Sequence, residues 1–367
     1  MRTTFASSSP SKTILPRGHG RGGFTLIELM FALVIGLFVV AALYNLFTAQ
    51  VRQFVYQDLQ MEMHQNTRLA TDMMSRTARL AGYGTNGTTA GAFGYEGVDS
   101  SSLPAIISSN GTGPNGSDAI TLVSMDPSLV VNTSSTFPPS CASTTLTVDT
   151  AALHNAARLA QYHEGELLMC YDYAAIGGFR SFLWPMTADA NVTSGELSIG
   201  SGSAYADYDI SCPVADNLPL VMTCSRAEVV TFYIDNDDSD GIGAGSADHP
   251  VLMMDLDFES PDADDVPLVD NVEDIQFAYC LASGSGLTDC SDPAAWVDEI
   301  DPDAASDVYM IRISLVVRSS REDLRHLHVG QRPELEGNPA SATTDHYFRQ
   351  VLSTEVAVRN MRIQSLL

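Results

Sequence analysis

The chain has 367 residues, a formal net charge of −26 at pH 7 and hydrophobic residues at 45% of its positions. This hydrophobic content supports a folded core and excludes a wholly disordered chain, and the length allows one large domain or two ordinary ones. The 45 acidic residues against 19 basic ones argue against nucleic-acid binding, which needs a clustered positive field.

The first 23 residues differ from the rest of the chain in charge. They contain no acidic residue and four basic ones: Arg2, Lys12, Arg17 and Arg21. The acidic excess therefore lies entirely beyond residue 23. A basic leader before an acidic body is typical of a sorting signal.

An apolar segment follows this leader. From Phe24 to Val51 the only charged residue is Glu28. About 20 helical residues span the hydrocarbon core of a bilayer, so the segment is long enough to cross a membrane. Arg17 and Arg21 precede it, and by the positive-inside rule the amino terminus stays in the cytoplasm while the body is exported.

Two simpler interpretations of the apolar segment are a signal peptide and a plain membrane anchor. A signal peptide needs a small-residue cleavage site after the segment, and residues 44–47 offer none. A plain anchor leaves Glu28 unexplained, because a carboxylate inside a membrane helix costs about 2.5–3.5 kcal/mol and is usually functional. Cleavage between Gly23 and Phe24 would create an α-amino group, which in a bundle of parallel helices can meet the carboxylate of a neighbouring subunit.

The stretch Gly23-Phe24-Thr25-Leu26-Ile27-Glu28 resembles the class III signal of type IV prepilins. The resemblance implies that a prepilin peptidase cleaves after Gly23 and that Phe24 becomes the methylated amino terminus. It also implies that Glu28 is the carboxylate that guides subunit docking during assembly.

The helical pattern continues beyond the apolar segment. Residues 50–81 contain neither proline nor glycine, and Gly82 is a suitable end. We therefore predict one helix from Phe24 to Ala81. Its predicted apolar stripe is Phe54, Val55, Leu59, Met63, Leu69, Met73, Met74 and Leu80. Four methionines are expected in core packing and not in a metal site: Met61, Met63, Met73 and Met74.

Beyond residue 83 the sequence predicts a β-rich head. The predicted strands are Ala119–Ser124, Thr144–Thr150, Glu166–Tyr173, Ala227–Ile234, Val251–Phe258, Val272–Leu281, Asp307–Arg318 and His346–Arg359. A charged loop, residues 319–344, joins the last two. We expect an α+β fold in which an antiparallel sheet packs on the exported half of the long helix.

These predictions divide the chain into four parts. They are a leader peptide (1–23), the membrane and assembly half of the helix (24–51), its exported amphipathic half (52–82) and a periplasmic β-rich head (83–367).

Further stretches of the chain resemble the minor pilins of the PilW group. They are residues 79–84 (RLAGYG), 268–276 (LVDNVEDIQ), 313–318 (ISLVVR), 348–351 (FRQV) and 356–360 (VAVRN). The resemblance implies a type IV pilin-like fold and favours a minor over a major subunit. Residues 85–225 show little recognisable pattern.

All six cysteines lie in the part predicted to be exported: Cys141, Cys170, Cys212, Cys224, Cys280 and Cys290. An even number outside the cytoplasm predicts disulfides. Proximity in sequence favours Cys212–Cys224 and Cys280–Cys290, which leaves Cys141–Cys170. No C-x-x-C pair is present, which argues against zinc.

One acidic stretch is a candidate for calcium. Asn236, Asp238 and Asp240 alternate before Gly241, as in the first half of a calcium-binding loop. The twelfth position holds Ala247 in place of glutamate, so the loop is incomplete. We favour a solvated acidic turn between two strands and keep Ca²⁺ binding as the alternative.

No enzyme is expected, because no P-loop, zinc-protease or serine-hydrolase motif occurs in the sequence. The resemblance implies a minor pilin that waits in the inner membrane and helps to prime pilus assembly for motility, adhesion or DNA uptake. Its implied partners are the prepilin peptidase, the major pilin, other minor pilins, the assembly platform and a tip adhesin, without direct nucleic-acid binding. The alternatives are a type II secretion pseudopilin, and a tip adhesin or calcium-dependent binding module on a pilin anchor.

Overall fold

The structure is a computed structural model. It describes residues 23–85, 88–90, 102–133, 145–151, 154–172, 180–200, 222–237, 245–246, 249–256, 265–282, 290–323 and 327–361. The chain divides into two compact units, Met1–Asp58 and Leu59–Leu367.

Helix α1 (Leu26–Leu80) crosses the boundary between the units and agrees with the predicted helix to within two residues. In the first unit nearly all its side chains are exposed. In the second unit one stripe is buried, and its members are Leu59, Met63, Thr67, Ala70, Met74, Ser75 and Ala78. These residues recur every three or four positions, so they occupy one face of the helix.

The predicted apolar stripe is therefore only partly right. Leu59, Met63 and Met74 are buried as predicted, whereas Leu69 is 48% exposed and Phe54 is 70% exposed. Met61, one of the four methionines expected in core packing, is 61% exposed. Small residues such as Ala70 and Ala78 take the remaining buried positions. Their small side chains let the helix backbone approach the sheets closely. The fit of side-chain size, more than hydrophobicity, therefore decides which helix positions are buried.

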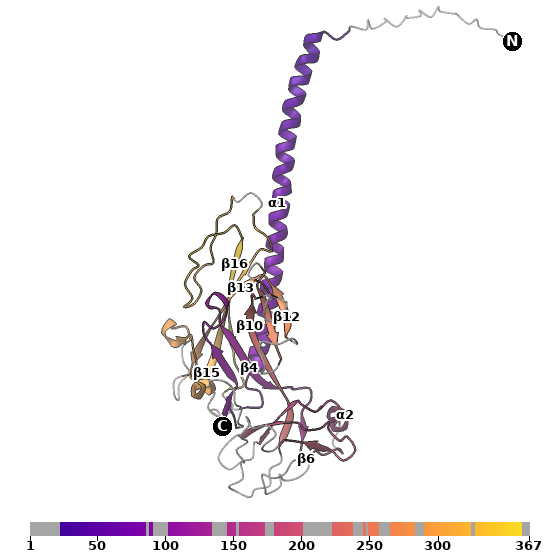
Figure 1. The fold of residues 1–367 in the computed structure, drawn as a ribbon, viewed down its shortest axis with the longest axis vertical. Helices are drawn as coiled ribbons and strands as arrows, with labels where there is room; N and C mark the ends of the chain where they lie inside the picture. The colour runs from indigo at the N-terminus through magenta and orange to yellow at the C-terminus, as the bar shows by residue number, and fades with distance from the viewer. Residues whose placement is uncertain are drawn as a thin grey trace, which may run out of the picture. The chain divides into compact units, whose positions relative to one another are not determined.

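Ten strands within the described residues form the first sheet (Figure 1). Its main path is β12 (Val266–Asp270), β11 (Val251–Asp255), β10 (Thr223–Asp235), β7 (Leu167–Asp172), β8 (Arg180–Pro185), β1 (Thr88–Ala90) and β2 (Ser102–Pro104). Off this path, β3 (Ile106–Ser109) pairs with β4 (Ala119–Met125), and both β4 and β5 (Val131–Asn132) pair with β10. All these pairs are antiparallel except β1 with β8.

The second sheet has four antiparallel strands in the described residues. Their order is β14 (Trp296–Val297), β13 (Val272–Leu281), β15 (Val308–Arg318) and β16 (Arg349–Ala357). The structure confirms the predicted boundaries of β13 and places β15 within one residue of prediction. Short 3₁₀ helices occur at Pro114–Gly116 (η1), Pro293–Ala295 (η3) and Pro302–Asp307 (η4).

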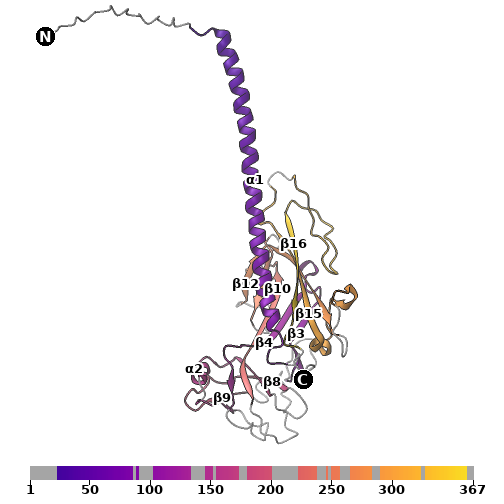
Figure 2. The ribbon, with the colours of Figure 1, turned by 180° about the vertical axis from the view of Figure 1, so that it is seen from behind.

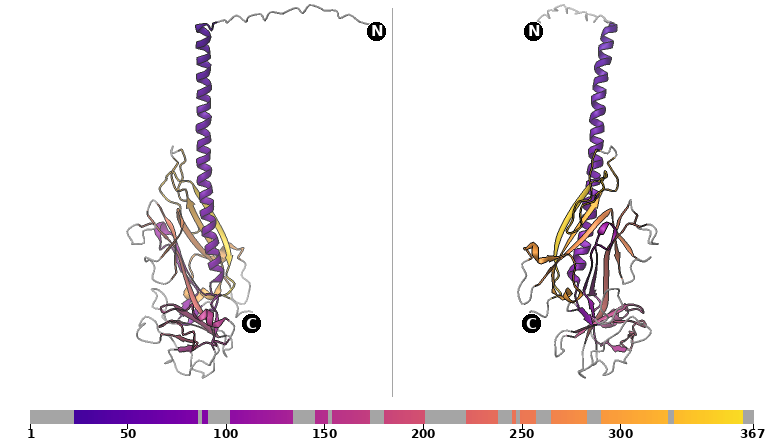
Figure 3. Two further views of the ribbon diagram at one scale, coloured as in Figure 1. Left: turned by 90° about the vertical axis from the view of Figure 1, so that its right-hand side faces the viewer. Right: turned by 60° about the vertical axis from the view of Figure 1, so that its left-hand side comes forward.

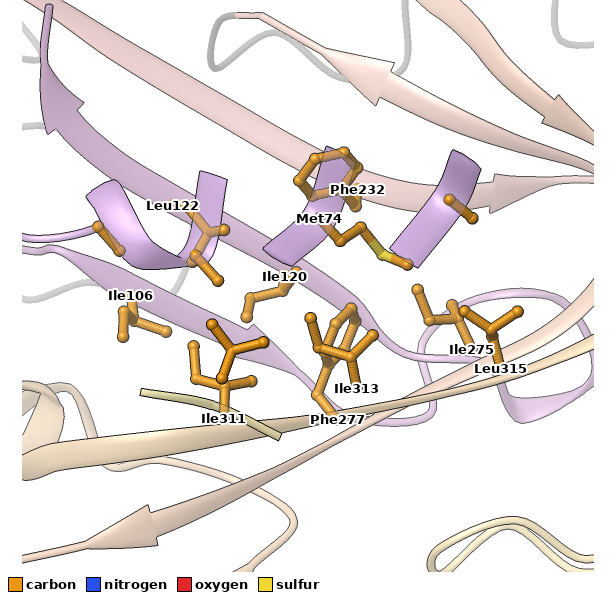
Figure 4. Packing of buried hydrophobic residues seen from close by; sticks show 14 of the residues in the cluster. Met74, Ile106, Ile120, Leu122, Phe232, Ile275, Phe277, Ile311, Ile313 and Leu315 are labelled. Carbon is orange, nitrogen blue, oxygen red and sulfur yellow. The ribbon is translucent and has the colours of Figure 1, made fainter. Parts of the chain in front are cut away.

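The buried stripe of α1 lies between these two sheets. One hydrophobic cluster joins it to β4 and β10 of the first sheet and to β13 and β15 of the second. Figure 3 shows strands on both sides of this part of the helix, and Figure 4 shows Met74 between Phe232 and Ile313. We predicted one sheet packed on the helix, and the structure shows two.

A second lobe lies at the amino-terminal end of β10 (Figure 2). It contains β5, the short helix α2 (Asn155–Leu159), β7, β8 and the two-stranded sheet of β6 (Thr145–Thr147) and β9 (Glu196–Ser198). Its own hydrophobic cluster includes Leu159, Tyr162, Trp184 and Cys224. Strand β10 is thus shared by two cores, one at each end.

Candidate functional site

The predicted cleavage point lies just before helix α1. Gly23 and Phe24 are non-helical and exposed, and 86% of Phe24 is accessible. A Cβ built on Gly23 would meet nothing within 4 Å among the described residues. The bond between these two residues is therefore open to an approaching protease in this structure.

Thr25 and Glu28 form a capping box at the start of α1. The Glu28 backbone N–H donates to the Thr25 hydroxyl at 3.3 Å, and the Glu28 carboxylate accepts from the Thr25 backbone N–H at 3.1 Å. The Thr25 hydroxyl also donates to that carboxylate at 3.0 Å. Reciprocal bonds of this kind satisfy backbone donors that the first helical turn leaves free.

The capping box gives Glu28 a structural role that the sequence analysis missed. Its signal was present as a threonine three residues before a glutamate ahead of an apolar run. The cap does not remove the cost of a carboxylate in a membrane helix. Both roles are therefore available to Glu28, as a cap within its own chain and as an ion partner between chains.

Helix α1 is the one helix among the described residues that is long and apolar enough to cross a membrane. In the first unit it exposes large apolar side chains on all sides, including Phe31, Leu37, Phe38 and Leu43. Such a surface needs a bilayer or other apolar helices around it.

The other end of α1 is capped by a residue from the end of the chain. The Asn360 side-chain amide donates to the carbonyls of Arg79 and Leu80, at 3.0 and 3.3 Å. Gly82 follows with a φ of +77°, the left-handed conformation that often ends a helix. Residues 79–84 and 356–360, two stretches that carried the family resemblance, therefore meet at the helix terminus.

We expect Asn360→Ala to lower the free energy of unfolding by about 1–2 kcal/mol, because two hydrogen bonds to helix carbonyls are lost. Urea unfolding of the full chain in detergent measures this. The matched control is Asn66→Ala, which removes a single bond from α1 to the Asp270 carbonyl. An Asn360→Ala loss smaller than the control loss would contradict the capping role.

A buried ion pair joins β13 to the loop between β15 and β16. The Arg332 guanidinium contacts the Asp274 carboxylate, with side chains 7% and 0% exposed. Asn338 donates to the same carboxylate at 3.0 Å, and Gln276 donates to it at 2.9 Å and to the Gly116 carbonyl at 2.8 Å. This network, which we call the Asp274 clasp, ties the loop to β13, and β13 in turn to the 3₁₀ helix η1.

A second buried carboxylate, Asp118, lies near the clasp. It is 3% exposed and accepts backbone N–H bonds from Gly111 at 2.8 Å and from Phe277 at 2.9 Å. Burial raises the pKa of Asp118 to about 6; the two backbone bonds oppose this rise, and the charge of Asp274 adds to it.

The raised pKa of Asp118 predicts a pH-dependent stability. Because the folded state favours the protonated carboxyl, the stabilising contribution is fully present below about pH 4 and is lost as pH rises through 6. A shift of about two units corresponds to about 3 kcal/mol. In urea unfolding, the free energy of unfolding of the native chain should fall by this amount between pH 4 and pH 7, relative to that of Asp118→Asn. A constant difference between the two proteins would contradict the assignment.

Arg349 anchors the start of β16 in a second ionic cluster. Its guanidinium donates to both oxygens of Glu273, at 2.6 and 2.9 Å, and contacts the Asp345 carboxylate. The Arg349 side chain is 7% exposed. Residues 268–276, one of the stretches that resemble the minor pilins, include Glu273, Asp274 and Gln276. This stretch therefore supplies polar side chains to both ionic clusters of the second sheet.

The comparisons with known proteins agree with these observations. Residues 231–360 match the family model of Type IV Pilus-assembly protein W, and residues 18–44 match that of the Prokaryotic N-terminal methylation motif. Both matches are consistent with a type IV pilin-like protein. No curated protein and no solved structure matches it.

The two matches cover different parts of the chain. The methylation motif includes Gly23, Phe24 and Glu28, and its apolar helix indicates a membrane anchor associated with a pilus. The match at 231–360 contains the second sheet, both ionic clusters and the cap at Asn360. These matches support a pilin-like role in a type IV pilus, with the prepilin peptidase among the partners.

The disulfides of the chain confirm one predicted pair and correct the others. Cys280–Cys290 forms as predicted. Cys170 bonds to Cys224, so the predicted pairs Cys212–Cys224 and Cys141–Cys170 are wrong. The physical reason is that Cys170 and Cys224 lie directly opposite each other in the β7–β10 pair, across a sequence separation of 54. Cys141 and Cys212 lie outside the described residues.

The candidate calcium loop is only partly described. Asn236 follows β10, whereas Asp238 and Asp240 lie outside the described residues. The neighbouring Asp235 carboxylate accepts backbone N–H bonds from Asp237 at 2.8 Å and Gly245 at 2.7 Å, which closes the turn. The described residues hold no group of three His, Cys, Asp or Glu able to bind a metal. Calcium binding stays a prediction.

Proposed function

We propose that this pilin-like protein is a minor pilin that helps to prime assembly of a type IV pilus, and that it acts by assembly and not by catalysis. The observation that carries the proposal is the pairing of a prepilin cleavage and methylation motif with a head that matches the pilus-assembly protein W model. The proposed partners are the major pilin, other minor pilins, the assembly platform and a tip adhesin.

The proposed mechanism begins in the inner membrane. The basic leader holds the amino terminus in the cytoplasm, and the head lies in the periplasm. Cleavage after Gly23 frees the Phe24 amine, and methylation keeps its positive charge. The exposed apolar half of α1 then leaves the bilayer for a bundle of similar helices, where the buried Glu28 carboxylate needs a cation and a neighbour's amine supplies it.

Deletion of the gene tests this proposal. We expect cells without the protein to lose most surface pili while the major pilin remains in the membrane, and we expect complementation to restore them. The native chain should occur in sheared pili in small amounts relative to the major pilin. Normal piliation in the deletion strain, with impaired export of type II secretion substrates, would instead identify a pseudopilin.

A further inference from the structure

The edge of strand β10 that faces β7 and β11 is interrupted at its centre. On this edge β7 pairs with residues 223–226, and β11 pairs with residues 231–235. Within the described part of the chain, residues 227–230 are paired only with β4, on the opposite edge. The interruption spans four residues, or about 13 Å of extended chain.

On one face of β10, the side chains change from apolar to charged at Arg226 and Glu228. Even-numbered side chains along a strand share a face. On this face Cys224 belongs to the core of the lobe, and Phe232 and Ile234 belong to the core around α1. Between them lie the charged side chains Arg226 and Glu228. Two hydrophobic cores are therefore separated by a polar position on a shared strand.

A cavity of about 460 Å³ opens at this position. Its walls include the apolar side chains of Leu167, Val230 and Leu256 and the charged side chains of Glu166, Arg226 and Glu228. Leu256 is 59% exposed although it is apolar. The cavity thus has apolar and charged walls, and its apolar wall is exposed at Leu256.

Arg226 is already engaged by two other carboxylates. Its guanidinium bonds Glu166 at 3.1 Å and Asp126 at 3.3 Å. Glu228 is half-buried and makes no hydrogen bond or ion pair with any described residue. Burial raises the pKa of Glu228, the charge of Asp126 raises it further, and the charge of Arg226 opposes the rise. Arg226 is thus the nearby cation for three carboxylates, and it forms ion pairs with Asp126 and Glu166 but not with Glu228.

We propose that this cavity receives a lysine side chain of another protein, with the ammonium group on Glu228 and the carbon stem against Leu256 and Val230. Lysine buries its aliphatic stem along apolar surface while its compact charge seeks a partner. A half-buried carboxylate gains more from an added cation than an exposed one does. The strongly acidic chain would also attract a basic partner at long range.

The lysine must come from a different protein. The only lysine of this chain is Lys12, within the leader that cleavage after Gly23 removes. A second processed copy therefore has no lysine to offer. The charged side chains of the cavity, Glu166, Arg226 and Glu228, lie outside the residues matched by both family models, whereas Leu256 lies within 231–360. A lysine contact at Glu228 therefore goes beyond the proposed assembly role.

Zero-length cross-linking with a carbodiimide tests the inference, because it joins a carboxylate to an amine only where the two touch. The reagent is applied to membranes and sheared pili from cells that produce the full chain, and cross-linked peptides are identified by mass spectrometry. We expect an isopeptide bond between Glu228 and a lysine of another protein.

Three variants sharpen this experiment. Glu228→Gln removes the carboxylate, and Leu256→Arg places a cation of the chain itself on the exposed wall of the cavity; each should abolish the cross-link. The matched control Glu299→Gln changes an exposed carboxylate elsewhere and should leave it intact. Circular dichroism melting shows whether each variant is folded.

Two results would overturn the inference. One is that other carboxylates of the chain cross-link to lysines while Glu228 does not. The other is that folded Leu256→Arg keeps the Glu228 cross-link at its native level. A chain that is absent from pili but carries the Glu228 cross-link in membranes would count against the proposed function and not against this inference.

Discussion

Replacement of Arg332 by methionine should lower the free energy of unfolding by about 3–5 kcal/mol, because it leaves Asp274 as a buried carboxylate without its cation. Arg332 and Asp274 are almost fully buried, and the remaining donors from Gln276 and Asn338 are neutral. The loss should be larger at pH 8 than at pH 5. Burial raises the pKa of Asp274 and Arg332 opposes that rise, so removal of Arg332 favours a protonated carboxyl, which relieves the unpaired charge at low pH. Urea unfolding in detergent, followed by tryptophan fluorescence, measures both values.

Arg76→Met is the matched control for this substitution. Arg76 pairs with Asp72 at 2.8 Å, with side chains 70% and 53% exposed. A surface pair of this kind contributes about 0.3–0.5 kcal/mol. Equal losses for Arg332→Met and Arg76→Met would show that the Asp274 clasp does not hold the second sheet in place.

Replacement of Glu28 by glutamine should reduce incorporation of the chain into pili by about ten- to a hundredfold, because a hydrogen bond to a charged partner contributes about 1.5–3 kcal/mol. Cleavage after Gly23 should continue, since the amide leaves the exposed cleavage segment unchanged. Quantitative immunoblots of sheared pili and membranes, together with the mass of the mature chain, measure both effects.

Thr25→Ala separates the two roles of Glu28. It breaks the capping box, which costs about 1 kcal/mol of helix stability, and it keeps the carboxylate. We expect this variant to enter pili nearly as well as the native chain. If Thr25→Ala failed like Glu28→Gln, the helix cap and not the charge would explain the need for Glu28.

The sequence predicted the long helix and the regular strands well. Strand β13 has the predicted ends, and α1 differs from prediction by two residues at its start and one at its end. These elements carry strong local signals, which are the apolar run of the helix and the apolar residues at alternate positions of β15, Ile311, Ile313, Leu315 and Val317. Such signals can be read from neighbouring residues alone, without knowledge of tertiary contacts.

Features that depend on contacts distant in sequence were not predicted. Arg332 lies in a loop interpreted only as charged, yet the structure buries it against Asp274, 58 residues away. The Cys170–Cys224 pair follows from strand pairing across the lobe and not from spacing along the chain. The close packing of α1 likewise depends on Ala70 and Ala78, whose small size gives no local signal of burial.

Amino-terminal sequencing and intact mass of the protein, from membranes of cells with and without prepilin peptidase, show whether the chain is a pilin precursor cleaved between Gly23 and Phe24. We predict a mature protein that begins at methylated Phe24 only where the peptidase is present. A start at Met1 in both strains, or at a residue beyond Val40, would contradict this cleavage and leave an anchored or secreted β-rich protein.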